Sequence, residues 1–362
     1  MAQINAFFSM LHEYGGSDLH LASGSQPLLR LRGQLTRIKY KVLEHEELKT
    51  MLYEITPEPK IKHFEETGDV DFAHELPGVA RYRVNFFMQH RGISAVFREI
   101  PQEIMTVEQL GLPERLRDLA MLNKGLVLVT GPTGSGKSTT LAAIIDHANK
   151  NRRDHILTIE DPIEFVHQPQ GCLINQREVG RDTGSFKAAL RGALREDPDI
   201  ILVGEMRDLE TIQLALEAAE TGHLVFSTLH TQSAHKTIDR IIEVFPEDSQ
   251  AQVRASLAES LRAVVSQTLF RRVDKPGRVA AQEILMGIPS VRNMIREGKT
   301  HQLPSVLQTG REAGMQTLDD EICRLLEGGI ISPEDALTQG QNREKIQVCL
   351  EKLGGGNGGG VR

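Results

Sequence analysis

The sequence predicts an α/β protein whose main domain is a parallel β-sheet covered by helices. Short apolar segments alternate with helical patterns between residues 126 and 229, an order typical of parallel sheets. Before residue 101, two segments alternate polar and apolar residues, which indicates a smaller α+β module with β-hairpins. After Ala234 the pattern is mainly helical, so we expect a helical C-terminal region.

Chain length and breaker residues divide the sequence into four parts. At roughly 150 residues per domain, 362 residues are enough for two or three domains. We expect an N-terminal domain over 1–100, a linker over 101–115, and the α/β domain with its helical part over 116–353. Residues 354–362 are mostly glycine, which offers no side chains for packing, so we expect a disordered tail.

The composition is that of a globular protein with a sizeable core. Hydrophobic residues make up 40% and charged residues 25% of the chain, which excludes disordered and collagen-like classes. The net charge of −7 disfavours nonspecific nucleic-acid binding. Aromatic residues make up only 4%, with no Trp, so stacking surfaces for single strands are few. We expect no nucleic-acid partner.

Cysteine usage and hydropathy indicate a cytoplasmic protein. Cys172, Cys323 and Cys349 are far apart, form no C-x-x-C pair and suggest no disulfide framework. That usage fits a reducing compartment and excludes a four-cysteine zinc site. The N-terminus lacks a signal-peptide pattern, and no stretch approaches the ~18 apolar residues of a membrane span. We expect membrane contact only through partner proteins.

The N-terminal region combines two hairpins and a helix. Residues Leu28–Ile38 alternate around Gly33, as the strands of a hairpin do. Ala80–Ile100 reads as two strands joined near His90–Gly92. Between these hairpins, Glu44–Tyr53 places its apolar residues on one side, which predicts a helix.

The α/β domain contains four predicted parallel strands and the helices between them. Each strand is a short apolar run, and each helix has apolar residues three and four positions apart. The predicted strands are Leu126–Thr130, Ile156–Ile159, Ile200–Val203 and Leu224–Thr228, and the predicted helices cover 137–149, 186–194 and 209–220.

A glycine-rich loop connects the first of these strands to its helix. Glycine lets backbone N–H groups converge on phosphate oxygens, and the helix N-terminus adds positive potential. Lys137 supplies charge to the β- and γ-phosphates, and the Ser138 hydroxyl can bind Mg²⁺. The loop matches the Walker A pattern in its strand–loop–helix context and therefore predicts binding of ATP with Mg²⁺. Its residues are Gly131, Pro132, Thr133, Gly134, Ser135, Gly136, Lys137, Ser138 and the adjoining Thr139.

A second Mg²⁺ contact is expected next to the strand at 200–203. Glu205 follows this strand where P-loop proteins usually have an Asp, and Asp199 lies at the other end of the strand. The position at the carboxyl end favours Glu205 as the acid that holds Mg²⁺, partly through water.

An acidic segment after the strand at 156–159 supplies candidates for a general base. Glu160, Asp161 and Glu164 follow this strand, with Pro162 fixing the turn between them. Clustered carboxylates repel one another, which raises at least one pKa and suits a group that activates water. At this level any of the three carboxylates can be the base.

Two histidines flank the strand at 224–228. His223 and His230 are an odd number of positions apart, so on a strand they point to opposite faces and a shared metal ion is excluded. His230 follows the carboxyl end of the strand, where it is a candidate contact for the γ-phosphate.

Taken together, these motifs resemble the ATPases that power type IV pili and type II secretion. The glycine-rich loop at 131–138, the acidic residues at 159–164, the strand ending in glutamate and the histidine segment at 222–231 follow the order of that family. The similarity covers nearly the whole chain, from Ser17–His20 to Arg292–Glu297. The short N-terminal region without a four-cysteine element is most similar to the members that drive pilus retraction.

This resemblance implies an architecture and a set of roles. It implies a RecA-like ATPase domain and a PAS-like N-terminal domain, assembled as a homohexamer with ATP between subunits. Glu164 would be the catalytic base, Glu205 the acid associated with Mg²⁺, and His230 a contact near the γ-phosphate. Arg83 and Arg98 match family arginines that reach the nucleotide from the N-terminal domain. The partner would be the inner-membrane platform protein of the pilus machine, with the ATPase peripheral to that membrane.

The resemblance also includes a segment near the C-terminus, Ser290–Glu297. At helical spacing, Val291, Met294 and Ile295 fall on one face. Arg292 and Arg296 lie together on another face. The family motif begins Ala-Ile where this chain has Ser-Val, a swap that is mostly volume-conserving. The resemblance implies that this segment serves retraction rather than nucleotide chemistry.

Two alternatives remain beside a retraction motor. One is a pilus-assembly or secretion ATPase of the same family, which the short N-terminal region disfavours. The other is a nucleotide-gated scaffold that binds ATP with little turnover. Phosphate release by wild type and by Glu164→Gln separates a motor from a scaffold.

Overall fold

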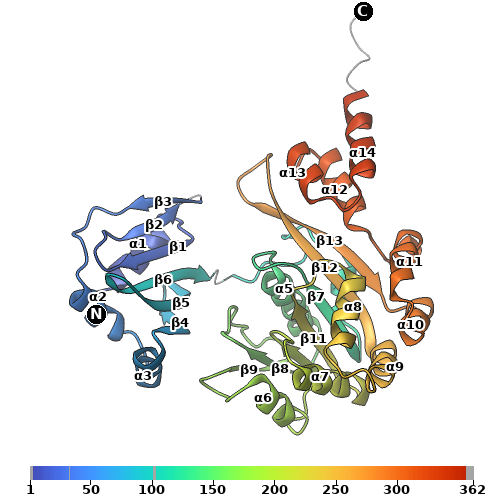
Figure 1. Cartoon of the computed structure of the whole chain (residues 1–362), viewed down its shortest axis with the longest axis horizontal. Helices are drawn as coiled ribbons and strands as arrows, with labels where there is room; N and C mark the ends of the chain where they lie inside the picture. The colour runs from blue at the N-terminus through green and yellow to red at the C-terminus, as the bar shows by residue number, and fades with distance from the viewer. Residues whose placement is uncertain (1–2, 32, 101–102, 356–362) are drawn as a thin grey trace, which may run out of the picture. The chain divides into compact units, whose positions relative to one another are not determined.

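The computed structural model describes residues 3–31, 33–100 and 103–355 (Figure 1). These residues form two compact units. The first unit extends to Glu103 and includes the segment Pro162–Val166. The second unit contains Ile104–Asp161 and the chain from His167 onward. Residues 101–102 of the expected linker and 356–362 of the expected tail lie outside the described part.

The first unit is a six-stranded antiparallel sheet with three helices. The strand order is β3-β2-β1-β6-β5-β4. The hairpins expected around Gly33 and near His90–Gly92 are confirmed, as is the helix expected at Glu44–Tyr53. The elements are β1 Asp18–Ala22, β2 Leu28–Leu31, β3 Gln34–Arg37, β4 Asp69–Leu76, β5 Ala80–Gln89, β6 Gly92–Ile100, α1 Asn5–Glu13, α2 His45–Tyr53 and α3 Glu58–Thr67.

An aromatic cluster forms the core of this unit. Phe8 of α1 stacks on Tyr82 of β5, with ring centroids 4.3 Å apart, and meets Phe97 of β6 edge-on at 5.0 Å. Along β5, Tyr82, Val84 and Phe86 are fully buried and the residues between them are not. This alternation places Arg83 on the face opposite the core, because successive strand residues point to opposite faces.

The second unit is built on a seven-stranded sheet. The strand order is β13-β12-β7-β11-β10-β8-β9, and every neighbouring pair is parallel except β12 and β13. The four expected strands are present; β10 has the expected bounds, and the other three are one or two residues longer. The strands are β7 Gly125–Thr130, β8 His155–Glu160, β9 Leu173–Glu178, β10 Ile200–Val203, β11 Leu224–Leu229, β12 Leu261–Arg271 and β13 Arg278–Met286.

Helices cover both faces of this sheet (Figure 1). Leu126 and Leu128 of β7 pack with α6 to α11 in one core, while Val127 and Val129 pack with α4 and α5 in another. The helices are α4 Arg115–Ala120, α5 Lys137–Asn151, α6 Phe186–Ala193, α7 Leu209–Thr221, α8 Ala234–Glu243, α9 Gln250–Ser260, α10 Pro289–Arg296 and α11 Leu303–Thr309, with short 3-10 turns at Thr300–Gln302 and Arg311–Ala313.

The expectation of a mainly helical chain after Ala234 is wrong for β12 and β13. These two strands add an antiparallel ribbon to the sheet beside β7. Residues 261–270 are largely buried in the sheet, although Arg262 and the polar triplet 266–268 interrupt their apolar pattern. Periodicity alone does not distinguish a buried strand of this kind from a buried helix. Strand β9 was also not expected, because its exposed edge carries several polar residues.

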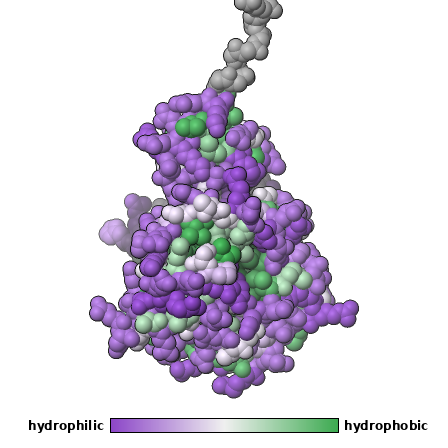
Figure 2. Space-filling model, turned by 90° about the vertical axis from the view of Figure 1, so that its right-hand side faces the viewer, coloured by the Kyte–Doolittle hydropathy of each residue, from purple (hydrophilic) through white to green (hydrophobic). Residues whose placement is uncertain are grey.

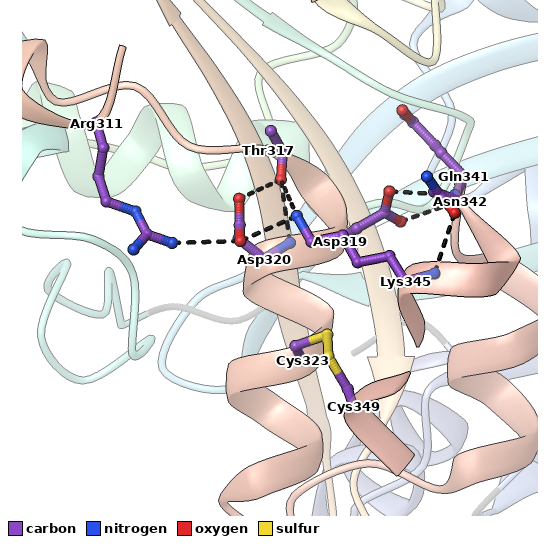
Figure 3. Close-up of a disulfide and its surroundings, with 9 residues drawn as sticks. All are labelled: Arg311, Thr317, Asp319, Asp320, Cys323, Gln341, Asn342, Lys345 and Cys349. Carbon is purple, nitrogen blue, oxygen red and sulfur yellow. Dashed lines mark hydrogen bonds and ion pairs between the residues drawn. A yellow bond between two sulfur atoms is a disulfide. The ribbon is translucent and has the colours of Figure 1, made fainter. Parts of the chain in front are cut away.

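A small helical subdomain ends the described chain (Figure 3). It contains α12 Leu318–Glu327, α13 Pro333–Gln339 and α14 Arg343–Gly355, which share a core with Phe270 and Val279 of the β12–β13 ribbon. Figure 3 shows the Asp319 carboxylate bound to the turn before α14, where it accepts hydrogen bonds from the backbone N–H groups of Gln341 and Asn342 at 2.8 and 3.1 Å.

The same subdomain contains a disulfide between Cys323 and Cys349 (Figure 3). The expectation of no disulfide framework is therefore wrong for two of the three cysteines. These residues are 26 positions apart in the sequence, and the packing of α12 on α14 brings their Cα atoms to 6.0 Å. Cys172 is free and buried. Sequence spacing gave no sign of the pairing because it arises from tertiary contact.

The face drawn in Figure 2 is mainly hydrophilic, with several apolar areas. Figure 2 shows a small apolar patch near the centre of the face on which the C-terminal helices lie. Among the described residues, no helix combines the length and the apolar character needed to cross a membrane.

Candidate active site at the carboxyl edge of the parallel sheet

The glycine-rich loop joins the end of β7 to the start of α5. Gly131, Gly134 and Gly136 have φ angles of 142°, 79° and 87°, which side chains rarely tolerate. A Cβ on Gly131 would lie 2.3 Å from the backbone oxygen of Gln267. Gly136 is the N-cap of α5. The backbone therefore turns as a phosphate loop requires, with the N-terminus of α5 at its end.

The loop combines exposed residues with a positively charged side chain. Lys137 Nζ donates hydrogen bonds to the backbone oxygens of Gly131 and Pro132 at 2.9 and 3.2 Å, which holds its ammonium group over the loop. Pro132, Thr133, Gly134 and Ser138 are exposed, and no acidic residue occupies the first turn of α5. The local charge is therefore positive, as an anionic phosphate requires.

Glu205 and His230 meet at the same edge of the sheet. Strands β7, β11 and β10 are parallel neighbours, so the residues that follow them lie beside one another. Glu205 follows β10 and His230 follows β11, and His230 Nε2 lies 3.7 Å from Glu205 Oε2. Glu205 Oε1 also forms an ion pair with Arg207 Nε at 2.8 Å. The carboxyl edge of a parallel sheet is where α/β proteins bind ligands.

Asp199 and His223 lie at the opposite ends of these strands. The Asp199 carboxylate accepts the backbone N–H of His155 at 2.9 Å, at the amino end of β8. His223 Nδ1 is 2.9 Å from the backbone oxygen of Ala218, at the end of α7. Both side chains are thus engaged in the fold. Within the described ranges, no group of three or more His, Cys, Asp or Glu side chains could hold a metal ion.

The acidic segment contains carboxylates in different surroundings. Glu160, the last residue of β8, accepts hydrogen bonds from Thr158 Oγ1 at 2.7 Å and Gln176 Nε2 at 3.2 Å, which gives it a structural task in the sheet. Glu164 lies in the segment grouped with the first unit, where Arg83 Nη1 is 3.8 Å from Glu164 Oε1. Its role as a base stays a prediction.

Arg83 and Arg98 lie side by side in the first unit. They form a directly opposed pair on β5 and β6, so their side chains share one face of that sheet. Arg98 Nε donates to the buried carboxylate of Asp18 at 2.9 Å. Burial alone raises the pKa of Asp18, but the hydrogen bonds from Ser17 and Arg98 outweigh it and lower the pKa below its usual value. Arg98 therefore also has a structural partner, which its sequence position did not reveal.

A buried polar residue on β12 lies beside the phosphate loop, and the sequence did not reveal its place in the site. Gln267 is 2% exposed and contacts the phosphate loop. The sequence offers little signal for it, because Gln267 lies between Ser266 and Thr268 in a region expected to be helical.

Comparisons with known proteins agree with this geometry. The profile of the family described as "Type II/IV secretion system protein" matches residues 4–332. The chain is 56% identical over 334 residues to the "Type IV pilus retractation ATPase PilT" of Pseudomonas aeruginosa, covering 92% of this chain and 95% of that protein. It is 53% identical over 320 residues to a "Twitching motility protein" of Neisseria gonorrhoeae, covering 88% and 86% of the two chains.

A solved structure extends the similarity to three dimensions. The crystal structure titled "Crystal Structure of the Pilus Retraction Motor PilT and Bound ADP" matches at a TM-score of 0.87 and 43% identity, covering 95% of this chain and 98% of that chain. This match confirms the expected α/β fold class with a RecA-like P-loop domain. The chain is a P-loop ATPase that belongs to the type II/IV secretion system protein family.

Proposed function

We propose that this chain hydrolyses ATP to power the retraction of type IV pili. The observation that carries the proposal is a complete phosphate loop beside Glu205 and His230, in a chain 56% identical to a pilus retraction ATPase over 92% of its length. The same similarity supports twitching motility as the cellular outcome.

Nucleotide binding rests on the loop between β7 and α5. Its glycines and the N-terminus of α5 present backbone N–H groups to the β- and γ-phosphates, and Lys137 supplies a positive charge. The residues also fit Mg²⁺, because the exposed Ser138 hydroxyl and the Glu205 carboxylate offer the hard oxygen ligands that this ion prefers. When bound, Mg²⁺ would neutralise charge on the phosphate oxygens, and Glu205 would hold it partly through water.

The proposed base is Glu164. Its carboxylate accepts a proton from water as the water oxygen bonds to the γ-phosphorus. The bond between that phosphorus and the β–γ bridging oxygen breaks, which yields ADP and phosphate. Glu160 is a weaker candidate because hydrogen bonds from Thr158 and Gln176 already engage its carboxylate. His230 would donate to the γ-phosphate, where its contact with Glu205 orients the ring.

Assembly as a homohexamer would complete the site. Arg83 and Arg98 of one copy would act on ATP held by the loop of a neighbouring copy, as arginine fingers do. Their shared face on the β5–β6 pair supports joint action. The partner of the ring would be the inner-membrane platform protein of the pilus machine, which makes the ATPase cytoplasmic and peripheral to that membrane. No nucleic acid takes part.

Helix α10 is the proposed link to retraction. Val291 and Ile295 are fully buried, as their spacing predicted. Arg292 and Arg296 have different partners, because Arg292 Nε donates to the backbone oxygen of Gly287 at 2.7 Å whereas Arg296 Nη1 donates to the Asn293 side chain at 3.0 Å. Arg296→Ala is thus the cleaner test. We expect it to keep ATPase activity within twofold of wild type and to lose pilus retraction.

The experiment that tests the function compares a strain lacking this protein with its parent. Retraction predicts excess surface pili and loss of twitching in the deletion strain. Cells without pili would instead indicate an assembly ATPase. Unchanged pilus number and motility would contradict both assignments to the pilus machine. Phosphate release by the purified protein excludes a scaffold with little turnover.

A further inference from the structure

A buried amide lies directly beneath the phosphate loop. Gln267 is on β12, which runs parallel to β7, and its neighbour Ser266 pairs with Thr130 at the last position before the loop. Gln267 Nε2 donates a hydrogen bond to the backbone oxygen of Ser135 at 2.5 Å. Gln267 Oε1 accepts one from Thr140 Oγ1, in the first turn of α5, at 2.8 Å. One side chain therefore joins the loop to the helix that follows it.

The chemistry of the partners fixes the orientation of this amide. A backbone oxygen can only accept, so the atom that faces Ser135 must be the nitrogen of Gln267. A second amide agrees with this, since Gln282 Nε2 of β13 donates to Gln267 Oε1 at 3.2 Å. Gln282 is fully buried as well. It limits the rotation of the Gln267 side chain.

The loop backbone packs closely against the same residue. Gly131 lies close to the Gln267 backbone. A Cβ on Gly136 would likewise lie 2.9 Å from Gln267 Nε2. Two of the three glycines that shape the loop thus face one residue of the neighbouring strand. The sheet does not need a polar side chain here, because the backbone hydrogen bonds of β12 are made to β7 and β13. Burying an amide costs free energy unless its hydrogen bonds are made, and this amide makes them to the loop and to α5.

We propose that Gln267 is a positioning residue that holds the phosphate loop in its nucleotide-binding shape, with Gln282 orienting its amide. Gln267 does not touch the nucleotide in this account, since it acts on the far side of the loop through Ser135 and Thr140. The inference rests on the nucleotide site and not on pilus retraction. We expect Gln267 to affect nucleotide affinity more than the rate of the chemical step, because the loop surrounds the β-phosphate in substrate, transition state and product alike.

The test compares ADP binding by two variants of Gln267 with that of a control. Gln267→Met keeps the length of the side chain and removes both polar atoms. Gln267→Glu keeps an acceptor for Thr140 and removes the donor to Ser135. Thr268→Val is the matched control, because this neighbour points to the other face of β12 and its side-chain hydroxyl makes no hydrogen bond to the described residues. Calorimetry with ADP and Mg²⁺ gives the dissociation constant well below the unfolding temperature.

We expect both Gln267 variants to weaken ADP binding about tenfold, the scale of one or two lost hydrogen bonds. Their KM for ATP should rise by a similar factor while kcat changes less than about threefold, as for uniform binding. Gln282→Met should weaken ADP binding by about threefold, and Thr268→Val should change it by less than about twofold. The rise in unfolding temperature that ADP produces should shrink in the Gln267 variants, which a purely structural role would not cause.

Two results would overturn the proposal. One is a folded Gln267 variant that binds ADP within twofold of wild type. The other is failure of both variants to fold, which would make Gln267 a requirement of the fold and not of the loop. A wild-type protein that binds ADP but does not drive retraction would refute the proposed function and leave this test intact.

Discussion

The two units of the chain bury their sheets in different ways. In the first unit, β5 alternates fully buried residues such as Tyr82 with outward ones such as Arg83. In the second, β7 is buried at every position from Gly125 to Thr130. A sheet covered on both faces can be reached by ligands only at its strand ends. An antiparallel sheet with one open face can present side chains along its strands.

This difference explains where each unit places its functional candidates. The loop at 131–138, Glu205 and His230 all follow strand ends of the covered sheet. Arg83 and Arg98 lie mid-strand on the open face of the other sheet. Substitutions at both places should therefore change activity much more than stability, because neither set contributes to the core.

The largest expected effect comes from the open face of the first unit. Arg83→Ala should lower ATPase activity of the assembled ring by about 10³-fold, the scale of a lost arginine finger. Arg37→Ala is the control, because Arg37 is an exposed strand arginine of the same sheet. Steady-state phosphate release measures both variants. Equal activity of the two variants would remove Arg83 from the mechanism. Arg98→Ala is less clean, since it also deprives buried Asp18 of its ion pair.

The second-largest effect is expected at Lys137, in the loop that follows β7 of the second unit. Lys137→Ala should lower kcat by at least ~10²-fold, because it removes the charge on the transferring phosphate. Lys150→Ala offers a control on the same helix, where Lys150 forms an ion pair with Asp146 at 2.6 Å far from the loop. Phosphate release at saturating ATP measures both variants. Near-normal turnover of Lys137→Ala would refute the assignment of the phosphate loop.

The identity of the base gives a third comparison. Glu164→Gln should retain ATP binding and lose about 10²-fold or more in hydrolysis, because only proton acceptance is removed. Glu160→Gln should be milder in its effect on chemistry, since that carboxylate is engaged by Thr158 and Gln176. ATP affinity and single-turnover rates separate the two variants. An inactive Glu160→Gln beside a fully active Glu164→Gln would reverse the assignment.

The smallest expected effect is a loss of stability of the second unit at acidic pH. Burial lowers the pKa of His167 to about 4, against an ordinary value of 6.5. The unfolded chain binds a proton at His167 more readily than the folded chain does. Neutral His167 is therefore fully compatible with the fold above pH 6.5, and stability is lost as the pH falls from there toward 4. Between pH 7.5 and 5.5 we expect a loss of about 1 kcal/mol in the free energy of unfolding.

Urea unfolding at both pH values measures this loss. His167→Gln removes the titrating group and should reduce the pH dependence by the same amount. A variant with the wild-type pH dependence would show that His167 does not carry this effect.

The sequence predicted most of the α/β alternation because buried strands between helices leave short apolar runs with sharp ends. It also predicted the β2–β3 and β5–β6 hairpins of the first unit, where alternation and the glycines at 33 and 92 coincide. The β12–β13 ribbon was missed since a long buried strand has no period that distinguishes it from a helix. The Cys323–Cys349 pair was missed because only the packing of α12 on α14 brings the two residues together.

The site was predicted unevenly for a similar physical reason. The phosphate loop is a local motif, so its residues can be recognised without knowledge of the fold. The contact of Glu205 with His230 depends on strand order, which the sequence only suggested through their shared position at carboxyl ends. Gln267 and the backbone partner of Arg292 depend on tertiary contacts between distant segments. No local pattern marks such residues.

The most direct test of the account mixes two inactive variants in one ring. We propose that arginines on the exposed sheet face of the first unit in one copy act on ATP bound at the strand ends of the second unit in another copy. Arg83→Ala and Lys137→Ala subunits should each be inactive alone, but a mixed ring of the proposed kind would contain interfaces with an intact loop and an intact arginine. The account predicts that phosphate release recovers in rings verified to contain both variants. Absence of recovery in such rings would contradict it.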